Sequence, residues 1–168
     1  MTAPLPEPGD PAPALALPDE EGTIHRLEDQ RGRWTIVYFY PADDTPGCTT
    51  EACEFRDANE TFRERGADVW GISPQGPASK RSFREKFGLP FVLLADTDHA
   101  AAEAWGTWVE KENYGRTYMG NARRTFLVDP DGRIVRTWPK VKPEGHAAEV
   151  LSALDEAQAA AARSGAAG

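Results

Sequence analysis

The sequence contains two cysteines, Cys48 and Cys53, and these are the side chains best suited to chemistry of their own. A cysteine thiolate attacks peroxide oxygen and disulfide sulfur, so two thiols close together in sequence suggest redox chemistry. The alternative is ordinary packing, because intracellular cysteines often behave as small buried hydrophobic residues. The residues around the two cysteines favour the redox interpretation.

Cys48 is predicted to lie in the first turn of a helix. The apolar run 34–40 has the length and composition of a buried strand, and Pro41 should end it because proline donates no hydrogen bond to a sheet. Thr45 has the residue type of an N-cap, and Pro46 suits the first helical position. Unpartnered N–H groups and the helix dipole favour a thiolate in a first turn, where a cysteine pKa can fall well below its free value of about 8.5.

Cys53 follows Cys48 by five positions, and an intact helix does not bridge this spacing with a disulfide. Five residues advance about 7.5 Å along a helix and about 500° around it, so the two side chains point to different sides. A disulfide needs Cα atoms within about 7 Å and converging Cβ vectors. Two interpretations stay open: Cys53 is inert core, or the first turns unwind after Cys48 is oxidised. The spacing is neither Cys-x-x-Cys nor that of a zinc site.

Strands and helices alternate along the rest of the chain, which predicts an α/β architecture with helices on both faces of a sheet. Two hairpins are expected, one at the amino-terminal side of Cys48 and one before a closing helix. A segment rich in Lys, Glu, Asn, Tyr and Gly, 109–121, is expected to be a long loop near a functional surface. The expected strands cover 12–17, 23–27, 34–40, 68–73, 91–95, 124–128 and 133–138, and the expected helices 48–65, 77–87, 100–105 and 143–162.

The cysteine segment resembles the peroxidatic motif of the peroxiredoxins. The motif is carried by Pro41-x-x-x-Thr45-x-x-Cys48 and the following Thr49-x-Glu51. The run from Gly47 to Cys53 is similar to the Q-type subfamily, also called bacterioferritin-comigratory proteins. The resemblance covers about Pro8 to Leu154 and includes the blocks 70–73, 91–96, 123–129 and 131–132.

This resemblance implies a single domain over 1–168 with a thioredoxin-like fold, an amino-terminal β-hairpin extension and a mixed central sheet. It also implies a thiol-dependent peroxidase that reduces hydrogen peroxide and organic hydroperoxides, with roles in antioxidant defence and redox homeostasis. Cys48 would be oxidised to sulfenic acid, and Cys53 would resolve it as an intrachain disulfide. Thioredoxin or a similar dithiol would then recycle the enzyme, an atypical 2-Cys arrangement. No cofactor or metal is expected.

An arginine completes the site in this family, on a later strand and two residues before a Ser/Thr-Phe pair. Arg123 matches that register, and its neighbour Arg124 is the alternative. Adjacent strand residues face opposite sides, so only one of the two can reach Cys48.

Three further residues are expected to contribute. The Thr45 hydroxyl is a candidate donor to the negative charge that develops on the leaving oxygen, or it only caps the helix. Pro41 would shield the sulfur from bulk water, or it only ends the strand. Glu51 would support the site by bonding to local backbone or by pairing with an arginine.

Composition is ordinary for one globular domain: 168 residues, 40% hydrophobic and 27% charged. The net charge of −8 argues against binding to nucleic acid or anionic membranes. No stretch has the roughly 20 apolar residues of a membrane helix, and the start lacks a signal-peptide pattern, so a cytoplasmic location is expected. The resemblance implies a monomer, and the ends, 1–8 and 163–168, are expected to be flexible.

Two rival functions use the same residues. A redox sensor would oxidise Cys48 and pass the signal to a partner without sustained turnover. A structural thioredoxin-fold protein would have inert cysteines and no fast reaction with peroxide. Sustained turnover of peroxide with a reductant would distinguish the peroxidase from both alternatives.

Overall fold

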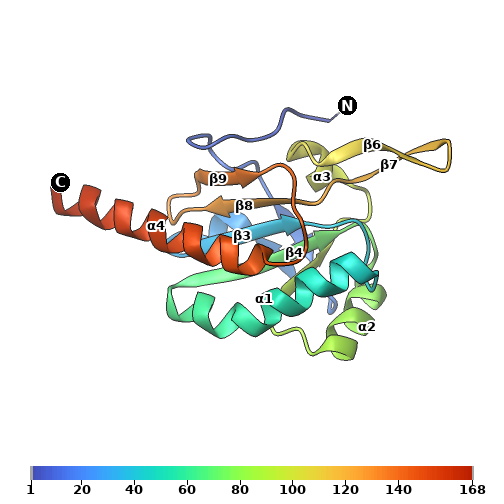
Figure 1. Ribbon diagram of the computed structural model, residues 1–168, viewed down its shortest axis with the longest axis horizontal. Helices are drawn as coiled ribbons and strands as arrows, with labels where there is room; N and C mark the ends of the chain where they lie inside the picture. The colour runs from blue at the N-terminus through green and yellow to red at the C-terminus, as the bar shows by residue number, and fades with distance from the viewer. Residues whose placement is uncertain (1, 168) are drawn as a thin grey trace.

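A five-stranded mixed sheet in the order β5-β4-β3-β8-β9 forms the centre of the structure (Figure 1). The computed structural model describes the backbone of residues 2–167 and the side chains of residues 2–163. Strand β3 is central, pairing in parallel with β4 and antiparallel with β8. All six of its residues are buried, as its continuous apolar sequence predicts. The five strands are β3 (Trp34–Phe39), β4 (Ala67–Ser73), β5 (Val92–Ala95), β8 (Arg124–Val128) and β9 (Ile134–Trp138).

Helices lie on both faces of this sheet, as predicted. On one face, Tyr38 of β3 belongs to an apolar cluster with residues of α1 (Pro46–Glu64), α2 (Pro77–Phe87) and α4 (His146–Ala167). On the other, Phe39 belongs to a second cluster that contains α3 (Ala100–Ala104) and the amino-terminal segment. Helices α1 and α4 lie side by side in Figure 1 and contact each other. Because the side chains of β3 alternate between the two faces of the sheet, this strand contributes to both apolar clusters.

The amino-terminal hairpin is present but shorter than expected, with β1 (Ala16–Pro18) and β2 (Ile24–Arg26) followed by the 3-10 helix η1 (Leu27–Gln30). The expected loop at 109–121 is wrong. That segment forms a second hairpin, β6 (Trp108–Asn113) and β7 (Arg116–Asn121), which projects from the body beside α3 in Figure 1. Its two turn residues, Tyr114 and Gly115, both have positive φ, at 53° and 78°. Two such residues make the tight turn whose twist matches paired strands.

The first residues, expected to be flexible, lie against the body in the structure. The amide of Ala3 donates to the Glu103 carbonyl at 2.8 Å, and the amide of Gly9 donates to the Ile134 carbonyl at 2.8 Å. Helix α4 begins later than expected, at His146, and its backbone continues to Ala167. Met1 and Gly168, which belong to the two ends expected to be flexible, lie outside the described residues. Among the described residues, none of the helices has the length and apolar character needed to cross a bilayer.

Candidate active site

The chain turns sharply between β3 and α1 and places Cys48 in the first turn of the helix. Asp44 has a left-handed conformation, with φ of 57°, and the extended residue Thr45 follows as N-cap. The first backbone hydrogen bond of the helix runs from the Thr49 N–H to the Thr45 carbonyl at 2.8 Å. The Cys48 amide precedes this bond, so it belongs to the N–H groups that have no intrahelical acceptor.

Thr45 occupies the N-cap position without capping the helix through its side chain. Its hydroxyl instead donates a hydrogen bond to the Ala42 carbonyl at 3.0 Å. The hydroxyl oxygen keeps its lone pairs, because a hydroxyl is both a donor and an acceptor. The hydroxyl hydrogen, expected from the sequence to be a donor to the leaving oxygen, is thus engaged by Ala42, and the loop fixes the orientation of the oxygen.

Arg123 contacts the sulfur of Cys48. Its Nη2 lies 3.2 Å from Sγ, although only 1% of Cys48 is exposed. The strand register explains the approach, because Phe39 of β3 pairs with Arg124 of β8 and Arg123 lies one residue further toward the end of β3. Cys48 is thus buried yet lies beside a cation. The guanidinium at this distance places an N–H donor and a positive charge directly against the sulfur.

Arg124 faces away from the sulfur, as alternation along a strand requires. Its Nε donates to the Pro139 carbonyl at 3.0 Å, and its Nη1 donates to the Gly106 carbonyl at 2.5 Å. These bonds tie β8 to the loop after β9 and to the end of α3. Of the two arginines, the structure brings only Arg123 to Cys48.

Glu51 lies three residues after Cys48 and accepts a hydrogen bond from the second terminal nitrogen of the same guanidinium. Arg123 Nη1 donates to Glu51 Oε1 at 2.6 Å, with the Glu51 side chain completely buried. Burial raises the pKa of Glu51 to about 7, even though the nearby Arg123 charge and hydrogen bond lower it. For Arg123, burial lowers the pKa, but attraction to Glu51 and Cys48 outweighs burial and leaves it raised. One cation therefore lies between two acidic groups.

Cys53 and Pro41, the two remaining predicted residues, are both partly exposed. Cys53 is half-buried, and both cysteines are free thiols. Its position five residues after Cys48 within α1 keeps the two side chains on different sides of the helix. Pro41 is also partly exposed, at the start of the loop that leads to α1, where its carbonyl accepts a bond from Gln75 Nε2 at 3.4 Å.

Lys111 of β6 is near the site, although the sequence did not single it out. The pKa of Lys111 is lowered, mainly by burial and also by the Arg123 charge, against an opposing effect of Cys48. Its stem passes close to Gly120 on the paired strand, on the same face of the hairpin. The only available signal was the polar composition of 109–121, which suggested a functional surface but gave no residue.

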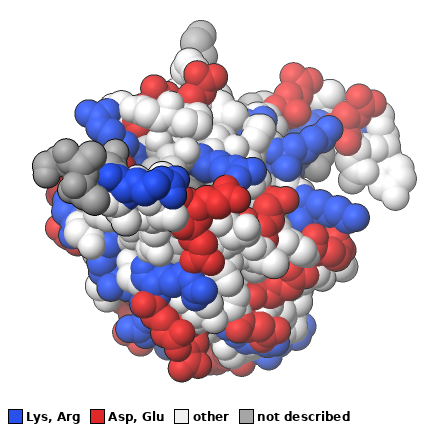
Figure 2. All heavy atoms as spheres, turned by 60° about the vertical axis from the view of Figure 1, so that its left-hand side comes forward, with Lys and Arg blue, Asp and Glu red and all other residues white. Residues whose placement is uncertain are grey.

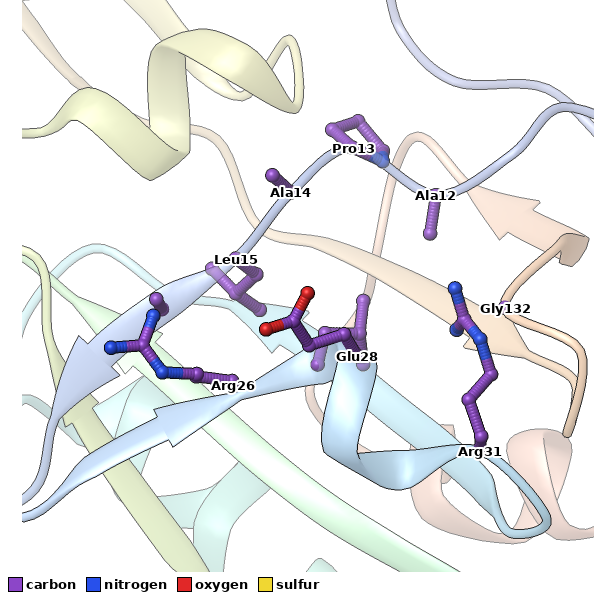
Figure 3. Close-up of a pocket in the computed structure, with 10 residues that line it drawn as sticks. Ala12, Pro13, Ala14, Leu15, Arg26, Glu28, Arg31 and Gly132 are labelled. Atoms are coloured by element: carbon purple, nitrogen blue, oxygen red, sulfur yellow. The ribbon is translucent and has the colours of Figure 1, made fainter.

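A pocket of about 390 Å³ lies elsewhere, between the amino-terminal segment and η1 (Figure 3). Arg26, Glu28 and Arg31 lie along one side of it, Ala12 lies across from them, and Gly132 is beside the Arg31 guanidinium. None of the residues predicted for the site lines it. Within the described part of the chain, no group of three or more His, Cys, Asp or Glu side chains is placed to hold a metal ion.

Comparison with known proteins assigns this chain to a family. Residues 8–137 match the AhpC/TSA family, which is most of the chain. Peroxiredoxin Bcp of Bacillus subtilis is 47% identical over 148 residues, covering 88% of this chain and 94% of the relative. Peroxiredoxin Bcp of Escherichia coli is 43% identical over 148 residues, covering 88% and 95%. The chain therefore belongs to the AhpC/TSA family, in its Bcp or Q-type peroxiredoxin branch.

Solved structures agree with this assignment. The bacterioferritin comigratory protein of Xanthomonas campestris matches with a TM-score of 0.80 at 40% identity, covering 84% of this chain and 90% of that one. A Cys-to-Ser mutant of PrxQ from Xylella fastidiosa matches with a TM-score of 0.84 at 34% identity, covering 93% and 99%. The predicted thioredoxin-like fold is confirmed. The protein is a thiol-dependent peroxidase, an antioxidant enzyme that uses a hydroperoxide and a thiol reductant.

Proposed function

We propose that Cys48 is the peroxidatic cysteine of this enzyme, that Cys53 resolves it within the same chain, and that thioredoxin or a similar dithiol reduces the resulting disulfide. The contact that carries the proposal is the 3.2 Å approach of Arg123 Nη2 to Cys48 Sγ. It combines a nucleophile with a fixed cation at the start of a helix, where negative charge is stabilised.

In the first step, the Cys48 thiolate attacks one oxygen of the hydroperoxide. The S–O bond forms as the O–O bond breaks, and the departing alkoxide or hydroxide takes up from solvent the proton that the Cys48 thiol released, leaving as alcohol or water. Cys48 becomes sulfenic acid. Arg123 and the Cys48 amide can donate to the oxygens as charge moves onto the leaving group, and one such donor is typically worth about 2.7–4 kcal/mol.

Thr45 would act as an acceptor in this step. Its hydroxyl hydrogen is engaged by Ala42, so the lone pairs remain for the O–H of a hydroperoxide. Such a bond would orient the peroxide with its terminal oxygen toward the sulfur. Pro41 would form the wall of the pocket beside the loop and limit the entry of bulk water.

In the second step, Cys53 attacks the sulfenic sulfur, the S–S bond forms and water leaves. The start of α1 must unwind for this, because a helix keeps residues five apart on different sides. Unwinding breaks the bonds of Arg123 to Cys48 and to Glu51. It also breaks the bond from the Thr50 hydroxyl to the Pro46 carbonyl, 3.0 Å long.

Both hydrogen peroxide and organic hydroperoxides are proposed as substrates. The Xanthomonas campestris relative is described by its alkyl peroxide reduction activity, which supports the organic class for this chain. Because both cysteines belong to one chain, the cycle needs no second copy, and we propose that the enzyme is a monomer. A dithiol reductant is consistent with a reducing compartment such as the cytoplasm. On the face drawn in Figure 2, basic side chains lie among acidic ones, so the described residues there offer no continuous basic surface for nucleic acid.

The test compares the reduced wild type with Cys48→Ser, Cys53→Ser and the double variant. Each is mixed with hydrogen peroxide or cumene hydroperoxide and followed by stopped-flow fluorescence, and the products are identified by intact-mass spectrometry. The wild type is expected to give an intrachain disulfide and sustained turnover with thioredoxin, thioredoxin reductase and NADPH. Cys53→Ser should consume one equivalent of peroxide, form a sulfenic acid that dimedone traps, and lose sustained turnover.

Three results would contradict the proposal. Peroxide consumption by Cys48→Ser at the wild-type rate would remove Cys48 from the first step. Full thioredoxin-linked turnover in Cys53→Ser would remove Cys53 from the second. A disulfide-linked dimer as the main wild-type product would show that the resolving thiol belongs to another chain. Slow oxidation followed by a stable complex with a partner would instead identify a redox sensor.

A further inference from the structure

Asp43, in the loop that precedes the Cys48 helix, forms a buried ion pair with Lys80 of α2. Lys80 Nζ is 2.9 Å from Asp43 Oδ2, and the two side chains are 0% and 3% exposed. Lys80 stands in the first turn of α2, where the helix dipole disfavours a cation. A lysine is almost never fully buried without a partner, so the Asp43 carboxylate is what holds this ammonium in place.

The pair is the centre of a network that joins the loop to three elements. Asp43 accepts from the Tyr40 hydroxyl at 2.5 Å, from the Ser79 hydroxyl at 2.7 Å and from the Ser73 hydroxyl at 3.3 Å. Lys80 Nζ also donates to Ser73 at 2.5 Å. These contacts attach the 41–45 loop to the end of β3, the end of β4 and the start of α2.

The network acts on the segment that aims Cys48. Asp44, the next residue, has a φ of 57°, a left-handed conformation that is uncommon for residues other than glycine, although aspartate adopts it more readily than most. Its own carboxylate bonds to Lys86 of α2 at 2.8 Å. Helix α2 therefore contacts both aspartates of the loop, but only Asp43 is held by a buried pair, and the loop leads into the helix start where Cys48 meets Arg123.

We propose that the Asp43–Lys80 pair is a positioning device that keeps the start of α1 folded around Cys48, and that Lys80 thereby sets the fate of the oxidised cysteine. The proposal rests on the function proposed above. Lys80 is a positioning residue, because it acts on the loop and has no hydrogen bond to the sulfur.

Two reactions compete for the sulfenic acid. In the unwound form, Cys53 condenses with it and water leaves. In the folded form, a second hydroperoxide oxidises it to sulfinic acid, with one oxygen transferred to sulfur and an alcohol or water released. A firmly held loop favours the second reaction, and a loosened loop favours the first. The ratio of sulfinic acid to disulfide therefore reports how well Lys80 holds the loop.

The experiment uses Lys80→Met, with Lys86→Met as the matched control. Lys86 lies on the same helix and pairs with the neighbouring Asp44, but the two side chains are 59% and 44% exposed, and exposed pairs contribute little. Reduced proteins are treated with graded hydrogen peroxide, and sulfinic acid and disulfide are quantified by intact-mass spectrometry. Amide hydrogen exchange at 46–53 is measured on the reduced proteins, as a readout independent of peroxide chemistry.

Lys80→Met is expected to lower the ratio of sulfinic acid to disulfide about tenfold, equivalent to about 1.4 kcal/mol, and to speed amide exchange at 46–53. Lys86→Met should stay within about twofold of the wild type. A drop in thermal midpoint for Lys80→Met, with the product ratio and the exchange of 46–53 unchanged, would assign Lys80 a merely structural role and overturn the inference.

The neutral pair Asp43→Asn/Lys80→Met replaces the single variant should Lys80→Met fail to fold, because it leaves no uncompensated buried charge. It is judged by the same ratio and the same exchange. The two proposals fail in different ways. A wild type that forms neither sulfenic acid nor an intrachain disulfide contradicts the proposed function and this inference with it. A wild type that cycles normally, beside a variant with wild-type ratio and exchange, contradicts this inference alone.

Discussion

Arg123 reaches Cys48 across 75 positions of sequence and donates a hydrogen bond to its sulfur at 3.2 Å. Neither residue alone makes a peroxide site, because a thiolate needs a stabilising cation and the departing oxygen needs a donor. Strand β8 pairs antiparallel with β3, and this register places Arg123 beside the end of β3, from which the chain turns into the Cys48 helix. Four predictions follow from this geometry and from the groups that hold it.

Replacing Arg123 with Lys should slow the oxidation of Cys48 by hydrogen peroxide by about 10²–10³-fold, the usual cost of losing a donor to a developing negative charge. Lysine presents a single ammonium and does not bridge Cys48 and Glu51 as the planar guanidinium does. Stopped-flow measurement of the second-order rate constant provides the check. Arg124→Lys is the matched control, since among the described residues Arg124 donates to backbone carbonyls and not to Cys48, and its rate constant should stay near that of the wild type. Equal losses in both variants would contradict the assignment of Arg123.

Gly47→Ala should slow the peroxide reaction without lowering stability. Alanine is a better helix former than glycine, by up to about 1 kcal/mol in a helix interior, and Gly47 has no positive φ that alanine would strain. A Cβ at this position, however, would stand 3.1 Å from Arg123 Nη2, which is tight. The guanidinium must shift, which weakens a bond to Cys48 or to Glu51. The expected result is a rate constant reduced several-fold with an unchanged or higher thermal midpoint; an unaltered rate would mean that Arg123 accommodates the methyl group freely.

Thr45→Val should reduce the rate of Cys48 oxidation about tenfold or more, whereas Thr45→Ser should retain most of it. Valine keeps the shape of threonine but removes both the bond to Ala42 and the acceptor oxygen proposed to orient the peroxide. The comparison of rate constants with hydrogen peroxide is made alongside urea denaturation, which measures the stability lost with the Ala42 bond. A Val variant with lower stability and a wild-type rate constant would limit Thr45 to a structural role.

Stability should depend on pH through Glu51. Burial raises its pKa in the folded protein from the ordinary value of 4.5 to about 7, so between these values the folded state binds more protons than the unfolded state. The contribution is therefore fully present below about pH 4.5 and is lost as pH rises through about 7, by up to about 3 kcal/mol. Glu51→Gln has no such ionisation. The wild type should lose free energy of unfolding relative to Glu51→Gln between about pH 5 and about pH 8, measured by urea denaturation.

The opposite trend would mean that the Arg123 charge dominates over burial at Glu51. In that case the folded-state pKa would lie below 4.5, and the wild type would gain stability over the variant as pH rises through the acid range. A pH-independent difference would indicate that Glu51 titrates alike in the folded and unfolded states.

Local sequence signals predicted most of the fold. Residues adjacent in the chain predicted the buried strand β3, the helix that follows Thr45-Pro46 and the final β8–β9 hairpin. The β6–β7 hairpin did not, because both of its faces carry polar residues and the apolar alternation that marks a strand is absent. Its turn, Tyr114-Gly115, also lacks the Asn-Gly or Asp-Gly pair that usually marks such a hairpin.

The sequence by itself determined which thiol stands at a helix start, how far away the second thiol is, and which family motif surrounds them. Those features are local, because capping, proline and helical spacing act over a few residues. Only the tertiary structure decided that Arg123 rather than Arg124 meets the sulfur, that Glu51 shares the same guanidinium, and that Lys80 is buried against Asp43. These pairings depend on strand register and on helix packing between distant segments, and a one-residue slip in register would reverse which arginine faces Cys48.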